Sequence, residues 1–142
     1  MKTVAQLLKL KPAGIVAIAP DATVLEAVKL LAEKNVGAVL VMDGPRLVGL
    51  FSEVDYARKV DLKGKSSANT PVSEIMTREV VFVTPTHTNE DCMALMTDKR
   101  VRHLPVVAND QVLGVLSIGD LVKDIISEQQ FIISQLESYI HR

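Results

Sequence analysis

Hydrophobic and polar positions along the chain follow one pattern that occurs twice. Pro20 aligns with Pro85, an offset of 65 residues, and the alignment continues without a gap for about forty residues. Most aligned pairs are apolar in both copies, and Gly49 aligns with Gly114. A duplicated unit that cannot close its own core must pack against its copy. The pattern therefore predicts a module with a pseudo-twofold axis and two related clefts.

Each half predicts the same series of elements: helix, strand, helix, strand, strand, helix. Short apolar helices are predicted at positions 4–8 and 72–76, which align at an offset of 68 rather than 65. The first copy therefore carries three extra residues, around Lys9 to Gly14. Valine- and isoleucine-rich runs at 15–18 and 80–83 predict the first strand of each half.

The longer helices have recognisable starts. Thr23 and Thr88 each precede an acidic residue three positions on, which is the pattern of a capping box. The strand pairs at 38–51 and 104–116 enclose Asp-Gly and Asn-Asp turns, and a closing helix is predicted to begin at Ser52 and at Ser117. We therefore expect an α+β fold, with two tandem α-β-α-β-β-α units related by pseudo-twofold symmetry.

Polar composition divides the chain into segments. We expect a first unit at 1–61, a polar connector at 62–71, a second unit at 72–126 and a C-terminal helical extension at 127–142. Apolar residues of the last helix recur at heptad spacing, with Val122, Gln129, Leu136, Ile125, Ile132 and Tyr139 on the seam and Ile126, Ile133 and Ile140 widening it. This stripe either packs on its own module or forms a homodimer or partner seam, and we favour the homodimer.

Composition excludes several classes of protein. With 48% hydrophobic residues and a net charge of −1, the chain is expected to be globular and not a nucleic-acid binder. The single cysteine, Cys92, cannot form an internal disulfide. The N-terminus lacks a signal-peptide pattern, and no apolar run approaches the ~20 residues of a membrane span. We therefore expect a cytoplasmic protein without membrane association.

Two Gly-x-x-Ser-x-x-Asp motifs carry the candidate chemistry, at 49–55 and 114–120. Each lies at a predicted strand-to-helix junction, where the serine and aspartate form a capping box in many ordinary helices. The alternative is a ligand site, because the glycine permits close backbone approach and the helix start offers free N–H groups. In that case Asp55 and Asp120 would each accept hydrogen bonds from a ribose diol, and the serines would face phosphate.

The two motifs, the Pro-x-x-Thr helix starts and the run Arg102-His103-Leu104-Pro105 together resemble the cystathionine-β-synthase (CBS) domain pair, or Bateman module. The resemblance extends from Val4 to about Ile126. It implies a pseudo-twofold module that binds adenine-containing ligands such as AMP, ADP, ATP, S-adenosylmethionine or NAD. It also implies a homodimer in which two modules form a flat disc.

The resemblance implies two clefts that mix residues of both halves. The first would use Ser52, Asp55, Val80, Val81, Arg102 and His103, with Pro105 beside them. The second would use Ser117, Asp120, Ile15, Val16, Gly37 and Ala38. Because it has Gly37 and Ala38 where the first has Arg102 and His103, the second is expected to prefer adenosine or a weakly charged ligand, or to stay empty. Val54 and Gly119 stand where family members often carry arginine, which favours AMP or NAD over a polyphosphate.

We expect a regulatory module that senses adenine nucleotides, with AMP favoured and NAD or ATP as alternatives. We expect no effector domain in this sequence, so that its output would pass to an unidentified effector protein. A ligand-free structural or interaction module is the second hypothesis, with both motifs acting only as helix caps. An enzyme is the third, because the sequence has no evident nucleophile–base pair and no metal-ligand spacing.

Overall fold

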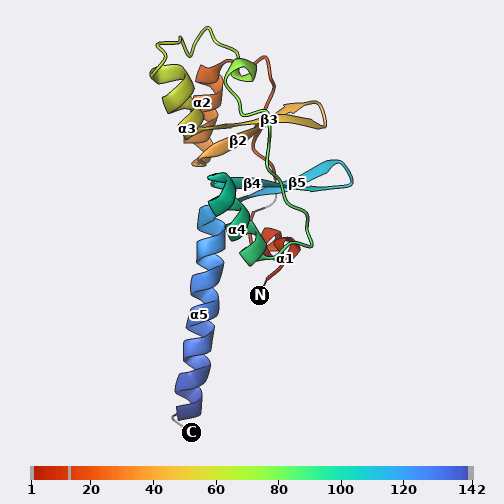
Figure 1. The fold of residues 1–142 in the computed structure, drawn as a ribbon, viewed down its shortest axis with the longest axis vertical. Coiled ribbons are helices and arrows are strands. Elements are labelled where there is room, and N and C mark those ends of the chain that lie inside the picture. The colour runs from red at the N-terminus through yellow and green to blue at the C-terminus, as the bar shows by residue number, and fades with distance from the viewer. Residues whose placement is uncertain (1, 13, 141–142) are drawn as a thin grey trace. The chain divides into compact units, whose positions relative to one another are not determined.

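The structure is a computed structural model that describes residues 2–12 and 14–140. Apart from the strand predicted at 80–83, its helices and strands follow the predicted order (Figure 1). They are α1 (Val4–Lys9), β1 (Ala17–Ile18), α2 (Val24–Lys34), β2 (Ala38–Asp43), β3 (Arg46–Ser52), α3 (Glu53–Asp55), η1 (Tyr56–Asp61), η2 (Val72–Glu74), α4 (Asn89–Lys99), β4 (His103–Ala108), β5 (Gln111–Ser117) and α5 (Ile118–Ile140). The predicted α+β class is confirmed.

The chain forms two compact units. The first-repeat unit consists of Gly14–Val81 and Val107–Leu113, and the second-repeat unit consists of Met1–Ala13, Phe82–Val106 and Gly114–Arg142. Each unit thus includes the short opening segment of the other repeat: η2 lies in the first-repeat unit and α1 in the second. The repeat in sequence and the compact unit in space are different divisions of the chain.

The first-repeat unit is built on a three-stranded sheet of order β1-β2-β3. Strand β1 runs parallel to β2, with Ile18 opposite Val41, and β2 pairs antiparallel with β3. Apolar side chains of α2, the sheet and η2 form one buried core, which contains Val24, Ala27, Leu31, Val39, Val41, Phe51, Val60, Val72, Ile75 and Met76. Val24, Ala27 and Leu31 recur at helical spacing and are the buried residues of α2.

The second repeat contains the hairpin β4–β5. Asn109 and Asp110 form its turn with φ angles of 52° and 60°, as the Asn-Asp pair predicted. Val83 forms a single parallel bridge to Val106, at the positions that correspond to Ile18 and Val41. In the second-repeat unit α4 packs against the start of α5, and Figure 1 shows the rest of α5 extending beyond α4.

Three predicted elements differ from the structure. The run at 80–83 is not a strand, because only Val83 pairs with β4. The predicted helix at 72–76 is a single 3₁₀ turn, η2, which follows Pro71. The closing helix of the first repeat widens into the π-helical turn η1, in which Leu62 N–H donates to the Ala57 carbonyl at 3.1 Å. The corresponding helix of the second repeat, α5, runs for 23 residues.

The motif glycines leave room for protein side chains. A Cβ at Gly49 would overlap the Met76 side chain and lie 3.1 Å from the Thr77 carbonyl oxygen. A Cβ at Gly114 would lie 2.9 Å from Leu8 Cδ2. The expectation that a ligand approaches these glycines is therefore wrong for both copies, because the opening segments of the repeats, η2 and α1, occupy that space.

This packing predicts that Gly49→Ala lowers the free energy of unfolding by about 1–3 kcal/mol, since an added methyl group must displace Met76 and press on the Thr77 backbone. Gly119→Ala is the matched control: it lies in α5 with only Ser117 Oγ nearby, at 3.6 Å, and alanine favours helix. Urea unfolding monitored by circular dichroism measures both changes. Equal stability of the two variants would contradict the packing role of Gly49.

Candidate functional site

The two compact units divide the residues that the sequence singled out. Ile15, Val16, Gly37, Ala38, Ser52, Asp55, Val80 and Val81 belong to the first-repeat unit, and Arg102, His103, Pro105, Ser117 and Asp120 belong to the second-repeat unit. Each motif can therefore be described within its own unit. The functional roles of these residues stay predictions.

Asp55 is buried in the first repeat, with 6% of its surface exposed. Its Oδ2 accepts from the Ser52 N–H at 3.0 Å and from Ser52 Oγ at 3.1 Å. Its Oδ1 accepts from Thr77 Oγ1 at 3.1 Å and pairs with Lys59 Nζ at 2.8 Å. Both carboxylate oxygens are thus occupied by protein donors, so this motif works as a capping box with two further partners.

Asp120 has a more open environment in the second repeat, with 26% of its side chain exposed. Its Oδ2 accepts from the Ser117 N–H at 2.8 Å and from Lys11 Nζ at 2.8 Å. Burial by itself would raise the pKa of Asp120, but the hydrogen bonds from Lys11 and Ser117 outweigh it and lower the pKa. No described donor contacts Oδ1, so Asp120 stays ionised with one oxygen open.

Lys11 alone makes contacts in the second repeat that several residues make in the first repeat. Its Nζ donates at 2.6 Å to the carbonyl of Val115, which aligns with Leu50. In the first repeat the Leu50 carbonyl accepts from the Thr77 N–H at 2.8 Å. One ammonium therefore contacts both the strand carbonyl and the motif aspartate, whereas in the first repeat the Thr77 N–H contacts the strand and Thr77 Oγ1 and Lys59 contact the aspartate.

The comparison of the two repeats in sequence missed this lysine. Lys11 lies in the three-residue insertion between Lys9 and Gly14, where the alignment has no counterpart. The insertion was the signal that could have pointed to Lys11. It adds a cation to the first copy, and no aligned position in the second copy indicates which residue that cation contacts. The sequence predicted fewer cations at the second motif than at the first, but the structure places Lys11 Nζ 2.8 Å from Asp120 Oδ2.

A second ion pair lies one turn further along α5. Asp124, which is 4% exposed, accepts from Lys2 Nζ at 2.6 Å and from Asn89 Nδ2 at 2.8 Å. Burial would raise the pKa of Asp124, but the bonds from Lys2 and Asn89 lower it. Lys2 and Lys11 stand at the two ends of the α1 segment, so ion pairs hold both ends of that segment to the first turns of α5.

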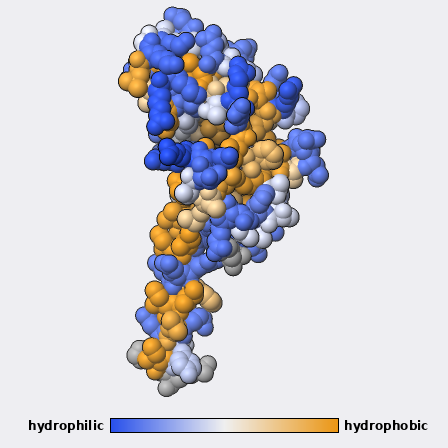
Figure 2. All heavy atoms as spheres, in the orientation of Figure 1, coloured by the Kyte–Doolittle hydropathy of each residue, from blue (hydrophilic) through white to orange (hydrophobic). Residues whose placement is uncertain are grey.

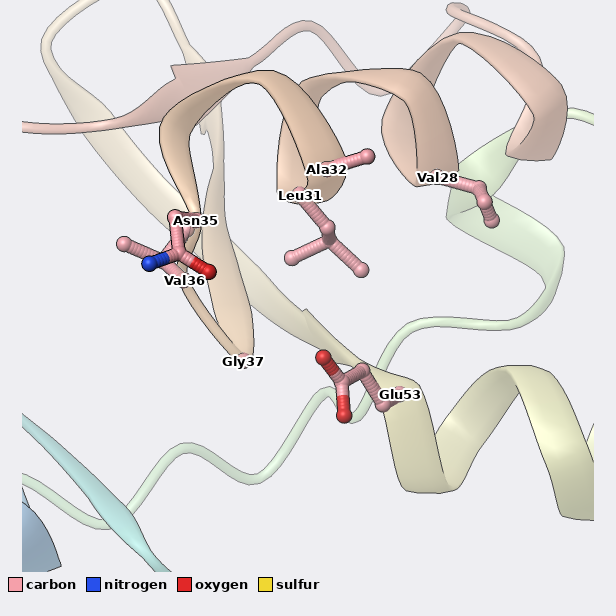
Figure 3. A pocket seen from close by; sticks show the side chains of 7 residues that line it. All are labelled: Val28, Leu31, Ala32, Asn35, Val36, Gly37 and Glu53. Atoms are coloured by element: carbon pink, nitrogen blue, oxygen red, sulfur yellow. The ribbon is translucent and has the colours of Figure 1, made fainter.

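Both repeats contain a shallow hollow at aligned positions. In the first-repeat unit a hollow of about 350 Å³ lies between the end of α2 and the start of α3, and Figure 3 shows the Glu53 carboxylate turned toward Leu31. In the second-repeat unit a hollow of about 330 Å³ has Arg100, Arg102 and Ile118 at its lining. Asn35, Gly37 and Glu53 are their counterparts. The hollow of the second repeat is therefore basic, and that of the first is acidic.

Backbone hydrogen bonds hold four of the remaining predicted residues. The Val16 carbonyl accepts from Leu40 N–H at 3.0 Å, and the Gly37 carbonyl accepts from Glu53 N–H at 3.1 Å. In the second repeat the Arg102 carbonyl accepts from Ile118 N–H at 2.9 Å, directly beside Ser117. Pro105 is buried, and its carbonyl accepts from Val83 N–H at 3.0 Å. Arg102 is thus tied by its backbone to the second motif, within the second-repeat unit.

Other chemistries have little support in the described part of the chain. Among residues 2–12 and 14–140, no group of three or more histidine, cysteine or acidic side chains could hold a metal ion. Cys92 is buried, and burial raises the pKa of its thiol to about 11, so it stays protonated at neutral pH. None of the described helices has the length and apolar content to cross a bilayer.

Comparison with known proteins gives a consistent match over most of the chain. A family model described as "CBS domain" matches residues 12–61 and 72–127. The chain is 40% identical over 125 residues to "CBS domain-containing protein CBSX3, mitochondrial" from Arabidopsis thaliana. That match covers 84% of this chain and 61% of the Arabidopsis protein, so the chain spans about three fifths of that relative.

Solved structures agree with the sequence match. A protein with CBS domains from Burkholderia ambifaria superposes with a TM-score of 0.87 at 49% identity, covering 90% of this chain and 96% of that chain. A CBS domain protein from Pyrobaculum aerophilum, PAE2072, is complexed with AMP. It superposes with a TM-score of 0.74 at 27% identity, covering 83% of this chain and 88% of that chain.

The buried Asp124 predicts a specific pH dependence of stability. Its pKa is lowered on folding, so its contribution is complete above the unfolded value of about 3.9 and is lost as pH falls through the native value. Asp124→Asn should lower the free energy of unfolding at pH 7 by about 1–3 kcal/mol. It should also flatten the fall in melting temperature between about pH 5 and pH 2.

Asp98→Asn is the control, because the side chain of Asp98 is 76% exposed. Melting temperatures of the three proteins across this pH range provide the measurement. A slope for Asp124→Asn equal to that of the unmodified protein would show that the Lys2–Asp124 pair does not contribute.

Proposed function

Because the chain belongs to the CBS domain family, we propose that it is a regulatory module that binds an adenine nucleotide. AMP is the ligand we favour, with NAD, ADP or ATP as alternatives. The AMP complex of the related Pyrobaculum aerophilum protein supports this ligand class. An enzymatic role is not part of the proposal, since Cys92 is protonated and no candidate metal cluster exists among the described residues.

The observation that carries the proposal is the open carboxylate oxygen of Asp120. Ser117 and Lys11 fix Oδ2, which orients the carboxylate, while Oδ1 remains an acceptor at a side chain that solvent reaches. A ribose hydroxyl can donate to such an ionised oxygen, and a charge-assisted bond of this kind contributes about 1.5–3 kcal/mol. The second motif is therefore our candidate for sugar recognition.

Charge in the second-repeat unit supports a phosphorylated ligand. Arg100 and Arg102 line its hollow, and the Arg102 backbone is bonded to the start of α5. Guanidinium groups bind phosphate oxygens through paired N–H donors. The first-repeat hollow presents Glu53 instead, which disfavours an anion. This distribution favours AMP over uncharged adenosine at the second motif.

The hypothesis that a motif acts only as a helix cap, without a ligand, fits the first motif better than the second. Asp55 is buried and all of its carboxylate contacts are satisfied within the first-repeat unit. Binding a diol there would require Thr77 or Lys59 to release the carboxylate. We therefore propose that Ser52 and Asp55 stabilise the junction of β3 and α3, and that the chain binds one nucleotide through Ser117 and Asp120.

The proposed module would also form a homodimer through the C-terminal part of α5. Leu121 and Asp124 are buried, but every residue from Gln129 to Ile140 is exposed, so this segment does not pack on its own unit. Figure 2 shows hydrophobic side chains along this part of the helix. The exposed apolar stripe consists of Val122, Ile126, Ile132, Ile133, Leu136, Tyr139 and Ile140.

Its spacing matches a heptad seam, which is buried most simply by the same stripe of a second copy. Ile132 and Leu136 stand at core positions of that seam, and both are more than half exposed. A dimer would place two nucleotide sites in one particle. Nucleotide binding could then shift the population of the form that an effector protein recognises.

Nucleotide binding predicts a rise in melting temperature with AMP. Saturating ligand at 100 times its Kd should stabilise the folded state by about 2.7 kcal/mol. Asp120→Asn should weaken AMP binding roughly tenfold or more, because an amide oxygen is a poorer acceptor than a carboxylate. Asp55→Asn should leave AMP affinity within about twofold while lowering stability by about 1–3 kcal/mol.

Isothermal titration calorimetry and thermal melts in AMP, ATP, NAD and adenosine provide the measurement. Loss of binding in Asp55→Asn alone would assign the ligand to the first motif instead. An absence of any effect at millimolar concentrations of all four ligands would leave the structural module as the better description.

The proposed seam predicts that the chain elutes as a dimer of the 15.5 kDa subunit at micromolar concentration. Ile132→Glu places a charge in the seam and should shift the equilibrium to monomer. Phe131→Glu is the matched control, since Phe131 is 65% exposed on the opposite face of α5. Size-exclusion chromatography with light scattering measures the mass. A dimer that persists in Ile132→Glu would place the interface elsewhere.

A further inference from the structure

Among the described residues Lys11 Nζ has two hydrogen-bond acceptors, which leaves one of its donors unused next to Asp120. An ammonium group has three N–H donors. Two are accounted for: one bonds the Val115 carbonyl at 2.6 Å and one bonds Asp120 Oδ2 at 2.8 Å. The lysine side chain is 33% exposed. The third N–H is therefore available on a side chain that solvent reaches.

The neighbouring carboxylate has the complementary property. Asp120 Oδ2 is shared by Lys11 and Ser117, whereas Oδ1 receives no bond from the described residues. The ion pair thus presents one acceptor, Oδ1, beside one donor, the third N–H of Lys11. The Val115 carbonyl on β5 holds the Lys11 ammonium, and the start of α5 holds the Asp120 carboxylate. The positions of donor and acceptor are therefore fixed relative to each other.

We propose that Lys11 is a specificity-determining residue of the nucleotide site, where it donates to one hydroxyl of a vicinal diol while Asp120 Oδ1 accepts from the other. A hydroxyl both donates and accepts hydrogen bonds, so two adjacent hydroxyls match this donor–acceptor pair. The proposal rests on the proposed function and deepens it. It predicts a ligand with both ribose hydroxyls intact.

The first repeat lacks this arrangement even though it also has a lysine. Lys59 contacts Asp55 Oδ1 at 2.8 Å and the Ile75 carbonyl at 3.1 Å. Thr77 Oγ1 lies 3.1 Å from the same oxygen, so the carboxylate of Asp55 offers no open acceptor beside the ammonium. Lys59 is therefore a natural control for a lysine that pairs with a motif aspartate without forming a donor–acceptor pair.

Lys11 also has a structural role that an experiment must separate. It holds the C-terminal end of the α1 segment to β5 and α5, as Lys2 holds the N-terminal end through Asp124. Lys11→Met is therefore expected to lower the melting temperature. Lys2→Met removes the other ion pair of the same segment and controls for that loss, and Lys11→Arg keeps a cationic donor.

The test compares AMP with 2′-deoxy-AMP and 3′-deoxy-AMP by calorimetric titration of the full chain. In the unmodified protein each analogue should bind roughly tenfold more weakly than AMP, since each lacks one hydroxyl. In Lys11→Met the penalty for one of the two deoxy analogues should disappear while the other persists. In Asp120→Asn the penalty for the other analogue should shrink. A merely structural lysine would weaken all three ligands alike.

Lys2→Met and Lys59→Met should preserve both penalties, and Lys11→Arg should restore most of the penalty lost in Lys11→Met. Retention of both penalties in Lys11→Met would overturn the role of Lys11 while leaving nucleotide binding intact. Lack of AMP binding by the unmodified protein would instead overturn the proposed function itself. The melting temperature of each variant shows whether it is folded at the titration temperature.

Discussion

The structure depends on how each repeat satisfies a carboxylate at the junction of its last strand and closing helix. An ionised group there has lost part of its hydration, so it needs donors close by. Asp55 receives hydrogen-bond donors from Ser52, Thr77 and Lys59, and it is buried. Asp120 receives them from Ser117 and Lys11 on one oxygen only. The same motif thus gives a closed junction in one copy and an open one in the other.

The opening segment of each repeat makes this difference, because it packs directly under the motif glycine. Met76 and Leu8 occupy the space beneath Gly49 and Gly114. After this shared contact the two segments diverge: one continues as Thr77, with a backbone N–H and a hydroxyl, and the other reaches Lys11 three residues beyond Leu8. Backbone donors are fixed by the sheet, whereas a lysine side chain can keep one donor free. Asp55 Oδ1 is filled by the Thr77 hydroxyl and by Lys59, whereas no described residue donates to Asp120 Oδ1, which leaves that acceptor beside the third N–H of Lys11.

The sequence predicted much of the fold because its signals are local or duplicated. Capping boxes at Thr23 and Thr88, the Asn109–Asp110 turn and the order of elements are confirmed. The resemblance to the CBS domain family is confirmed as well. The pairing of Lys11 with Asp120 was missed because it joins positions 109 residues apart and lies in an insertion without an aligned partner. The role of the motif glycines was misjudged, since only three-dimensional packing distinguishes space for a ligand from space for Met76.

The duplicated pattern of the two repeats therefore does not extend to charge. The aligned hollows carry Asn35, Gly37 and Glu53 in one repeat and Arg100, Arg102 and Ile118 in the other. An anionic ligand meets repulsion at the acidic hollow and attraction at the basic one, so charge and the open carboxylate of Asp120 both favour the second repeat. Three additional residues in the first copy therefore accompany an occupied carboxylate at Asp55 and an open carboxylate oxygen at Asp120, and we propose the second junction as the one that responds to a ligand.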